Sequence, residues 1–106
     1  MGVPTACIVV DREVVGWIDF DVERDWLKPG EVNLGYFLAA AARGYGYATR
    51  AVELFLSYLA AETDHRVATL LIDLRNERSL AVASRANFER AEDIGGGAAY
   101  FKRAFR

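Results

Sequence analysis

A glycine-rich segment, Arg43-Gly44-Tyr45-Gly46-Tyr47-Ala48, lies between an apolar run and a helical pattern. Gly44 and Gly46 have no side chains that would obstruct a bulky anion. A helix beginning near Gly46 adds unpaired amides and about half a positive charge. Because that dipole contributes only about 0.3–2 kcal/mol, useful affinity requires several amides together with Arg43. The segment predicts a pyrophosphate cradle, and a flexible loop before a helix is the alternative.

Two other nucleotide-binding motifs fit this turn less well. A dinucleotide fingerprint needs glycines in a GxGxxG pattern at the first strand-to-helix turn, with an acid about 20 residues later. Here Thr49 stands at the third glycine position, and the turn follows a third, antiparallel-looking strand. A nucleoside triphosphate loop needs Gly-Lys-Ser/Thr, which this segment lacks. Both alternatives are disfavoured.

A hairpin is predicted at the start of the chain. Residues 5–10 and 14–21 are β-branched and apolar runs, separated by the polar tripeptide Asp-Arg-Glu. In the second run apolar and acidic side chains alternate at the end, so Asp19 and Asp21 share one face of the strand.

A third strand is predicted over residues 31–38, after a polar loop that closes with Lys-Pro-Gly. Gly35 lies in its middle. Glycine weakens a strand interior unless the backbone bulges or another group approaches it closely. The position therefore predicts a close approach to this strand.

A helix over residues 46–61 and a strand over residues 66–74 follow. The helix has apolar residues at three- and four-residue intervals. This stripe consists of Ala48, Val52, Phe55, Leu56 and Leu59. The strand is apolar on both faces, as expected after a helical crossover. The pattern predicts an α/β fold, in which a mixed, mostly antiparallel sheet holds a central parallel strand-helix-strand unit.

A second helix is predicted to begin after Asn76, whose short side chain suits the N-cap position, and to run to about residue 90. Phe88 and Ala91 are assigned to its buried side. The Gly-Gly-Gly run at residues 95–97 then breaks the chain, and residues 98–105 are predicted to form a closing strand.

Composition limits the function classes. The 106 residues suit one domain, residues 1–106, and 13 basic against 15 acidic residues give a net charge of -2, which disfavours nucleic acid as a partner. The longest apolar run is far below the roughly 18 residues of a membrane span, so we expect a cytoplasmic protein with no membrane partner. With one cysteine, Cys7, interpreted as a buried thiol, and one histidine, no metal site is expected.

Three blocks of the sequence resemble the Gcn5-related N-acetyltransferase (GNAT) superfamily. Residues 43–48 resemble its Arg/Gln-x-x-Gly-x-Gly/Ala acetyl-CoA motif, and Asn-Leu-Gly-Tyr-Phe-Leu at 33–38 is similar to its splayed fourth strand. Residues 76–79, Asn-Glu-Arg-Ser, with residues 82–88 resemble the branch that acetylates ribosomal-protein N-termini. That branch ends the helix in a Gly-Phe pair, and Asn87, which tolerates a left-handed backbone, stands at the glycine position. The resemblance covers about residues 6–103.

The resemblance implies acetyl-CoA as the acetyl donor. The backbone of residues 35–38 would pair with the pantetheine arm, and amides of residues 43–49 would hold the pyrophosphate. Asn76 would reach the pantetheine and the Ser79 hydroxyl would lie near the thioester sulfur, with plain helix capping as the alternative for both. The implied cofactor-binding residues are Tyr36, Phe37, Leu38, Arg43, Gly44, Tyr45, Gly46, Tyr47, Ala48, Thr49, Asn76 and Ser79.

The implied reaction is attack of a neutral amine on the acetyl carbonyl. The branch has an acid two residues before the strand glycine, but this chain has Asn33 there, and an amide cannot accept the proton. Glu31 points to the same face one step earlier, and Asp19 and Asp21 lie on the neighbouring strand; each is otherwise a solvated strand residue. Ser79, Glu31 and Asn33 are the candidate catalytic residues. Ala83 occupies the place of the tyrosine that serves relatives as general acid.

The family's opening strand and two helices have no counterpart before Thr5. The chain is therefore interpreted either as a truncated product or as one half of a homodimer in which a second copy covers the sheet. The expected function is transfer of acetyl from acetyl-CoA to a primary amine, such as a protein N-terminus or a small molecule. A noncatalytic acyl-CoA-binding or oligomeric assembly module is the alternative.

Overall fold

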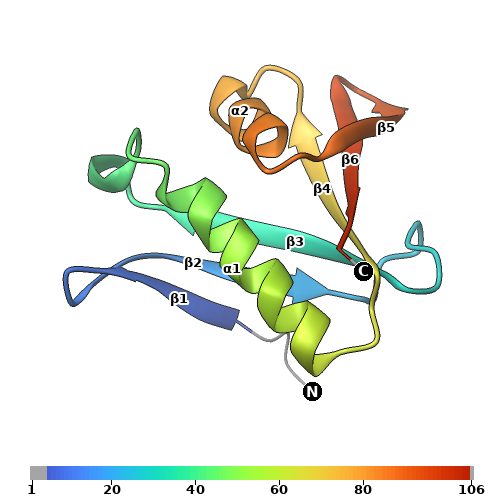
Figure 1. Ribbon diagram of the computed structural model, residues 1–106. Coiled ribbons are helices and arrows are strands. Elements are labelled where there is room, and N and C mark those ends of the chain that lie inside the picture. The colour runs from blue at the N-terminus through green and yellow to red at the C-terminus, as the bar shows by residue number, and fades with distance from the viewer. Residues whose placement is uncertain (1–4, 106) are drawn as a thin grey trace.

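The computed structural model describes residues 5–105, which form a six-stranded mixed sheet with both helices on one face (Figure 1). The strand order is β1-β2-β3-β4-β6-β5, and only the β3–β4 pair is parallel. The strands are β1 (Thr5–Val10), β2 (Glu13–Asp21), β3 (Glu31–Leu38), β4 (Val67–Asp73), β5 (Glu89–Gly95) and β6 (Ala98–Ala104). The helices are α1 (Tyr47–Glu62) and α2 (Glu77–Arg85), with a short 3-10 turn, η1 (Ala40–Ala42), before α1.

The core lies between the sheet and its two helices. Helix α1 runs across β1, β2 and β3, whereas α2 lies beside the upper part of β4 (Figure 1). Val52 and Leu59 of α1 and Ala83 of α2 are fully buried or nearly so, in one cluster with Val32 of β3. The opposite face of the sheet, here called the open face, carries no helix among the described residues.

β3 has two different neighbours along its length. It pairs with β2 from Asn33 to Leu38, but it pairs with β4 only through Glu31–Asn33 opposite Val67–Thr69. Beyond that point β4 continues alongside β6 as far as Asp73. β3 and β4 therefore separate, and within residues 5–105 the β4-side edge of β3 has no strand partner after Asn33.

Most predicted elements are confirmed, including the hairpin, the third strand, the first helix with its apolar stripe, and the parallel pair. Asn76 is the N-cap of α2, and Asn87 has the expected left-handed backbone, with φ of 61°. The fold class is as predicted.

The predicted end of the second helix is wrong. α2 ends at Arg85, and residues 89–95 form β5, in which Ala91 is exposed rather than buried. Every residue of β5 is exposed, and its sequence has no alternation of apolar and polar residues that would indicate a strand. Backbone pairing with β6 holds β5 in place. Cys7 is also exposed, on β1, and is not a buried thiol.

Within residues 5–105, no helix is long and apolar enough to cross a membrane.

Candidate functional site

A cleft of about 500 Å³ lies where β3 and β4 separate, between the end of β3, the start of α1 and helix α2. Here it is called the strand–helix cleft. Its lining comprises Tyr36, Phe37, Leu38, Arg43, Gly44, Gly46, Tyr47, Ala48, Thr49, Asn76, Glu77, Arg78, Ser79, Ala81, Val82 and Arg85. All the cofactor-binding residues predicted from sequence are in this set except Tyr45, which is exposed and stacks on the Tyr47 ring.

The glycine turn presents main-chain donors to the cleft. Gly44 and Gly46 have φ of 88° and 81°, a backbone conformation that favours glycine. Gly46 is the N-cap of α1 and no side chain caps it, so the amides of the first helical turn lack an intrahelical partner. A Cβ added to either glycine would meet nothing within 4 Å. Backbone conformation, and not crowding, therefore requires these glycines.

The charge of the cleft differs from that of the chain. Arg43, Arg78 and Arg85 line it, against a single carboxylate from Glu77. The Arg43 Nε also donates a hydrogen bond of 3.1 Å to the Leu38 carbonyl, which ties the turn to the end of β3. The cleft is thus a local excess of positive charge in a chain of net charge -2, as phosphate binding requires.

One buried polar atom in the cleft lining lacks a partner. The Thr49 Oγ1 is inaccessible to solvent and has no hydrogen bond within the described part of the chain. Thr49 lies in the first turn of α1, beside the unpaired amides. Buried hydroxyls are nearly always hydrogen-bonded, so this atom suits a ligand that supplies an acceptor.

A side-chain contact bridges the separated elements. The Tyr36 hydroxyl of β3 lies 3.2 Å from the Ser79 Oγ of α2 and donates to it. Asn76 Oδ1 accepts the Ser79 amide at 3.2 Å, so capping occupies the oxygen of Asn76 but not its NH₂ group. The sequence assigned Tyr36 a backbone role only, because no local pattern could place its hydroxyl against a residue 43 positions later.

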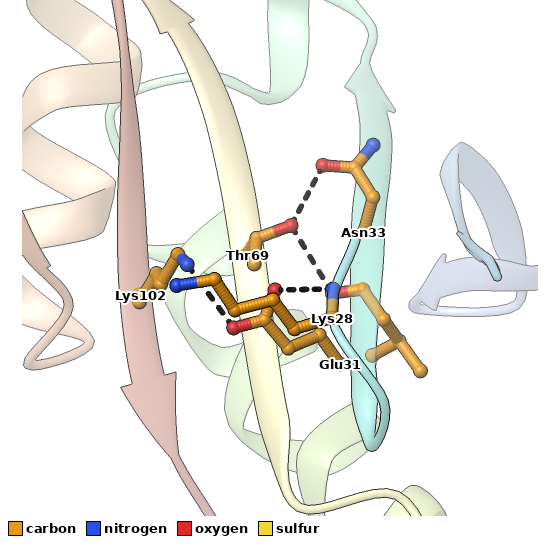
Figure 2. A network of polar contacts seen from close by, with 6 residues as sticks. Lys28, Glu31, Asn33, Thr69 and Lys102 are labelled. Carbon is orange, nitrogen blue, oxygen red and sulfur yellow. Dashed lines mark hydrogen bonds and ion pairs between the residues drawn. The ribbon is translucent and has the colours of Figure 1, made fainter. Parts of the chain in front are cut away.

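The other two predicted catalytic residues lie outside the cleft lining, in a polar network of the paired half of β3 (Figure 2). Glu31 Oε2 is 3.1 Å from the Lys102 Nζ, its Oε1 accepts the Lys28 amide at 3.1 Å, and its side chain is only 9% exposed. Both oxygens of Glu31 are therefore engaged. The Thr69 hydroxyl lies 3.1 Å from Asn33 Oδ1 and 3.2 Å from the Val32 carbonyl.

Asp19 lies on the same face, on β2, and is partly buried. It pairs with Gly35, and a Cβ on Gly35 would lie only 2.9 Å from Asp19 Oδ1. Burial raises the pKa of Asp19, and the Asp21 charge raises it further; the Gly35 amide and Arg24 oppose the shift. The close approach predicted at Gly35 is thus made, within this chain, by a carboxylate. The sequence offered Asp19 only as one of several acids.

A second hollow, of about 740 Å³, lies between β1 and α1 and is mainly apolar. Ile8, Ile18, Leu54, Phe55 and Tyr58 are among the residues that line it. It contains none of the predicted site residues except Tyr47, which also lines the strand–helix cleft.

A mixed sheet whose parallel pair separates beside a glycine turn defines an acyltransferase-type fold, and the comparisons agree. The acetyltransferase (GNAT) domain model matches residues 3–89, so the chain belongs to the GNAT family. The family resemblance is confirmed. A search of curated proteins gives no significant match.

Solved structures share the fold at low sequence identity. An aminoglycoside acetyltransferase in complex with coenzyme A has a TM-score of 0.83 and 20% identity, over 96% of this chain and 66% of that one. An N-acetyltransferase from Staphylococcus aureus Mu50 has a TM-score of 0.80 and 21% identity, over 98% and 68%. A ribosomal-protein-S5-alanine acetyltransferase from Vibrio fischeri has 0.74 and 18%, over 92% and 59%. The chain thus spans about two thirds of these proteins or less, and the ribosomal-protein branch stays a prediction.

Proposed function

We propose that this protein transfers the acetyl group of acetyl-CoA to a primary amine. The observation that carries the proposal is the convergence of unpaired amides, an arginine excess and an unpartnered strand edge on one cleft. Family membership supports it, as do relatives solved with coenzyme A or acetyl-CoA. Acetyl-CoA is the acetyl donor in this proposal.

The donor would lie along the strand–helix cleft. The amides of residues 44–49 and the Thr49 hydroxyl would hold the pyrophosphate, because they lie at and just before the N-terminus of α1. The amide of Arg43, also expected to take part, donates instead to the Ala40 carbonyl at 3.2 Å, so Arg43 would contribute its side-chain charge. The free edge of residues 35–38 would pair with the amide groups of the pantetheine arm as an added strand does. Arg78 and Arg85 supply further positive charge for the phosphates.

The reaction would be direct acetyl transfer. The amine nitrogen attacks the thioester carbonyl carbon, a C–N bond forms, and the C–S bond breaks with its electron pair passing to sulfur. The nitrogen loses one proton to solvent, which balances the proton that the sulfur gains. Ser79, hydrogen-bonded by Tyr36, is the proposed proton donor to the leaving thiolate, and strand amides near Phe37 would polarise the carbonyl oxygen. Tyr36 thereby takes the part for which Ala83 has no hydroxyl, and solvent restores the proton.

Glu31 and Asn33 receive positioning roles in this proposal. Glu31 is held by Lys102 and by the Lys28 amide, so its carboxylate fixes the loop before β3 to β6. Asn33 meets Thr69 at the last rung before the strands separate. Both residues would therefore keep the unpaired half of β3 at a fixed distance from β4.

The acceptor class is a primary amine. One of the similar structures is a ribosomal-protein-S5-alanine acetyltransferase and another is an aminoglycoside acetyltransferase, so both a protein N-terminus and a small-molecule amine fall within the proposal.

The cytoplasm is the proposed location. A homodimer is also proposed, with β1, the end strand of the described sheet, and the adjoining apolar hollow as the surface for the second copy. Sedimentation over a range of concentrations tests it, and a strictly monomeric protein contradicts it.

Two measurements test the proposed function. Titration calorimetry with acetyl-CoA should give saturable binding, and an assay of thiol release with a panel of primary amines should give turnover. Binding without release on any amine would favour the noncatalytic acyl-CoA-binding module. Absence of binding would overturn both interpretations.

A further inference from the structure

The open face carries an aromatic pair directly beside the cleft. Trp17 of β2 is paired with Phe37 of β3, and their rings stack with centroids 6.2 Å apart and planes at 24°. Trp17 is 41% exposed and Phe37 is 48% exposed. Phe37 also lines the strand–helix cleft, so the aromatic surface continues from the cleft onto the open face.

Asp19 follows Trp17 on the same face of β2. Its partner Gly35 is two residues beyond Asn33, the last residue of β3 that pairs with β4. Gly35 has no side chain, and a Cβ there would meet the Asp19 carboxylate at 2.9 Å. The carboxylate therefore lies against the part of β3 that has no β4 partner among the described residues.

The charged groups around Asp19 leave it without a direct ion pair within residues 5–105, although the charge of Arg24 acts on it and lowers its pKa. Asp21 on the same strand is paired with Arg24 at 2.8 Å, and Glu31 on β3 is paired with Lys102 of β6. On β1 the residue opposite Asp19 is Thr5, which carries no charge. Of these three carboxylates, Asp19 alone has no ion pair within residues 5–105, and it is partly buried. A partly desolvated carboxylate without a direct ion pair favours the approach of an ammonium group.

We propose that Asp19 and the Trp17–Phe37 pair form the acceptor site: they bind a protonated primary amine that carries an aromatic or apolar group, and Asp19 accepts the proton that the amine must lose. This inference rests on the proposed function and extends it by a substrate class and a base. The aromatic faces favour both the apolar group and the adjacent cation. Gly35 leaves the carboxylate in this position, because a Cβ there would push Asp19 Oδ1 aside.

The step balances without a further reactant. One ammonium proton passes to the Asp19 carboxylate, and the freed nitrogen lone pair forms the C–N bond. The C–S electron pair leaves on sulfur, which takes a proton from the Ser79 hydroxyl, and a second proton leaves the new amide nitrogen. The products are the N-acetylated amine, free thiol and one net proton released to solvent.

Phenethylamine is the probe, because it joins a primary ammonium to an aromatic ring. Titrated into the protein saturated with coenzyme A, it should bind saturably, and 2-phenylethanol should bind at least tenfold more weakly. Asp19→Asn should weaken phenethylamine binding at least tenfold, whereas the matched Asp21→Asn should change it less than threefold. Equal binding of amine and alcohol, no saturable binding of the amine, or an unaffected Asp19→Asn variant would overturn the acceptor site.

An assay of thiol release with phenethylamine tests whether Asp19 accepts the proton of the amine or only supports the structure of the site. Asp19→Asn should lower kcat/KM at least tenfold near pH 7 with acetyl-CoA affinity unchanged, and the deficit should shrink as pH approaches the pKa of the amine itself, where neutral amine needs no base. A deficit that stays the same at every pH would overturn the proton role. Failure of the parent protein to bind acetyl-CoA would instead contradict the proposed function, so the two failures are distinguishable.

Discussion

The two halves of β3 differ although they form one continuous strand. In the first half, Glu31–Asn33 pairs with β4 and is cross-linked to it and to β6 through Thr69 and Lys102. In the second half, residues 35–38 pair with β2 alone and turn their other edge to the cleft. Unsatisfied strand edges are normally protected, so an unpaired half beside a rigid half indicates a binding edge.

This contrast explains why polar residues of similar type have different roles in the two halves of β3. Carboxylate and amide groups in the paired half meet partners on β4, β6 and the preceding loop, and so hold the strand. Beside the unpaired half, the Tyr36 hydroxyl meets Ser79 of α2, and the Asp19 carboxylate of β2 lies against Gly35; these are the two groups that we propose to act on the substrate. Substitutions in the two halves should therefore separate stability from activity.

The largest effect is expected at the turn that extends the unpaired half. Gly46→Val should reduce acetyl-CoA affinity at least 100-fold, because valine strongly disfavours φ of 81° and the first amides of α1 would turn away. Calorimetry measures the affinity. Gly96→Val is the matched control, since Gly96 has φ of 65° and open space in the β5–β6 turn, outside the cleft lining. Equal retention of affinity in both folded variants would contradict the cradle.

A smaller loss is expected when the contact between β3 and α2 is cut. Tyr36→Phe should lower kcat about tenfold while acetyl-CoA affinity changes less than threefold, because it removes the hydroxyl that donates to Ser79. Steady-state thiol release measures it. Tyr45→Phe, outside the cleft lining, should leave kcat unchanged. A parallel loss in both variants would show that the Tyr36 hydroxyl has no special part.

A substitution that disturbs the paired half of β3 should change the stability of the protein instead of its activity. Thr69→Val should lower the free energy of unfolding by about 1 kcal/mol, because Asn33 Oδ1 and the Val32 carbonyl lose a buried donor. Denaturant unfolding measures this change, with Ser57→Ala on the exposed side of α1 as the control. Acetyl-CoA affinity should stay within about threefold of the parent. A stable variant that cannot bind would reverse the assignment of the two halves.

The sequence predicted the periodic parts of the molecule well. The α1 stripe and the β2 alternation are local patterns, the parallel pair follows from the strand-helix-strand spacing, and each is confirmed. β5 was missed because its side chains are exposed on both faces, so that only backbone pairing defines it.

The cleft could be assembled from three motifs, but its contacts could not. The Glu31–Lys102 pair joins residues 71 positions apart, and the Tyr36–Ser79 bond joins residues 43 positions apart. Nothing in the local spacing specifies such partners, because strand register and the crossing of α2 over the sheet determine them. The same holds for Asp19, whose importance depends on the absence of a side chain on the neighbouring strand.

Asp19 should also give a stability change with a defined pH dependence. Its pKa is raised above 3.8 by burial and by Asp21, so the folded state holds its proton more tightly than the unfolded state does. Ionisation above pH 3.8 therefore costs stability, and the cost is complete above the folded pKa. Asp19→Asn should unfold at a higher temperature than the parent at pH 7, with the difference vanishing below pH 3. Thermal unfolding at both pH values measures it; a variant less stable at pH 7 would contradict the desolvated carboxylate.

The smallest effect is expected at Asp73, at the end of β4, in the turn that leads to α2. Hydrogen bonds from the Arg75 side chain and amide lower the pKa of Asp73 to about 2. A lowered pKa contributes stability above pH 3.8 that is lost as pH falls through about 2. Arg75→Ala should return the carboxyl titration toward 3.8 in a carbon NMR titration, whereas Arg90→Ala, which removes an arginine from a remote pair, should not. Because the Asp73–Arg75 pair is exposed to solvent, kcat should change less than twofold; a larger loss would mean that this turn, and not only the Asn76 cap, sets the position of Ser79.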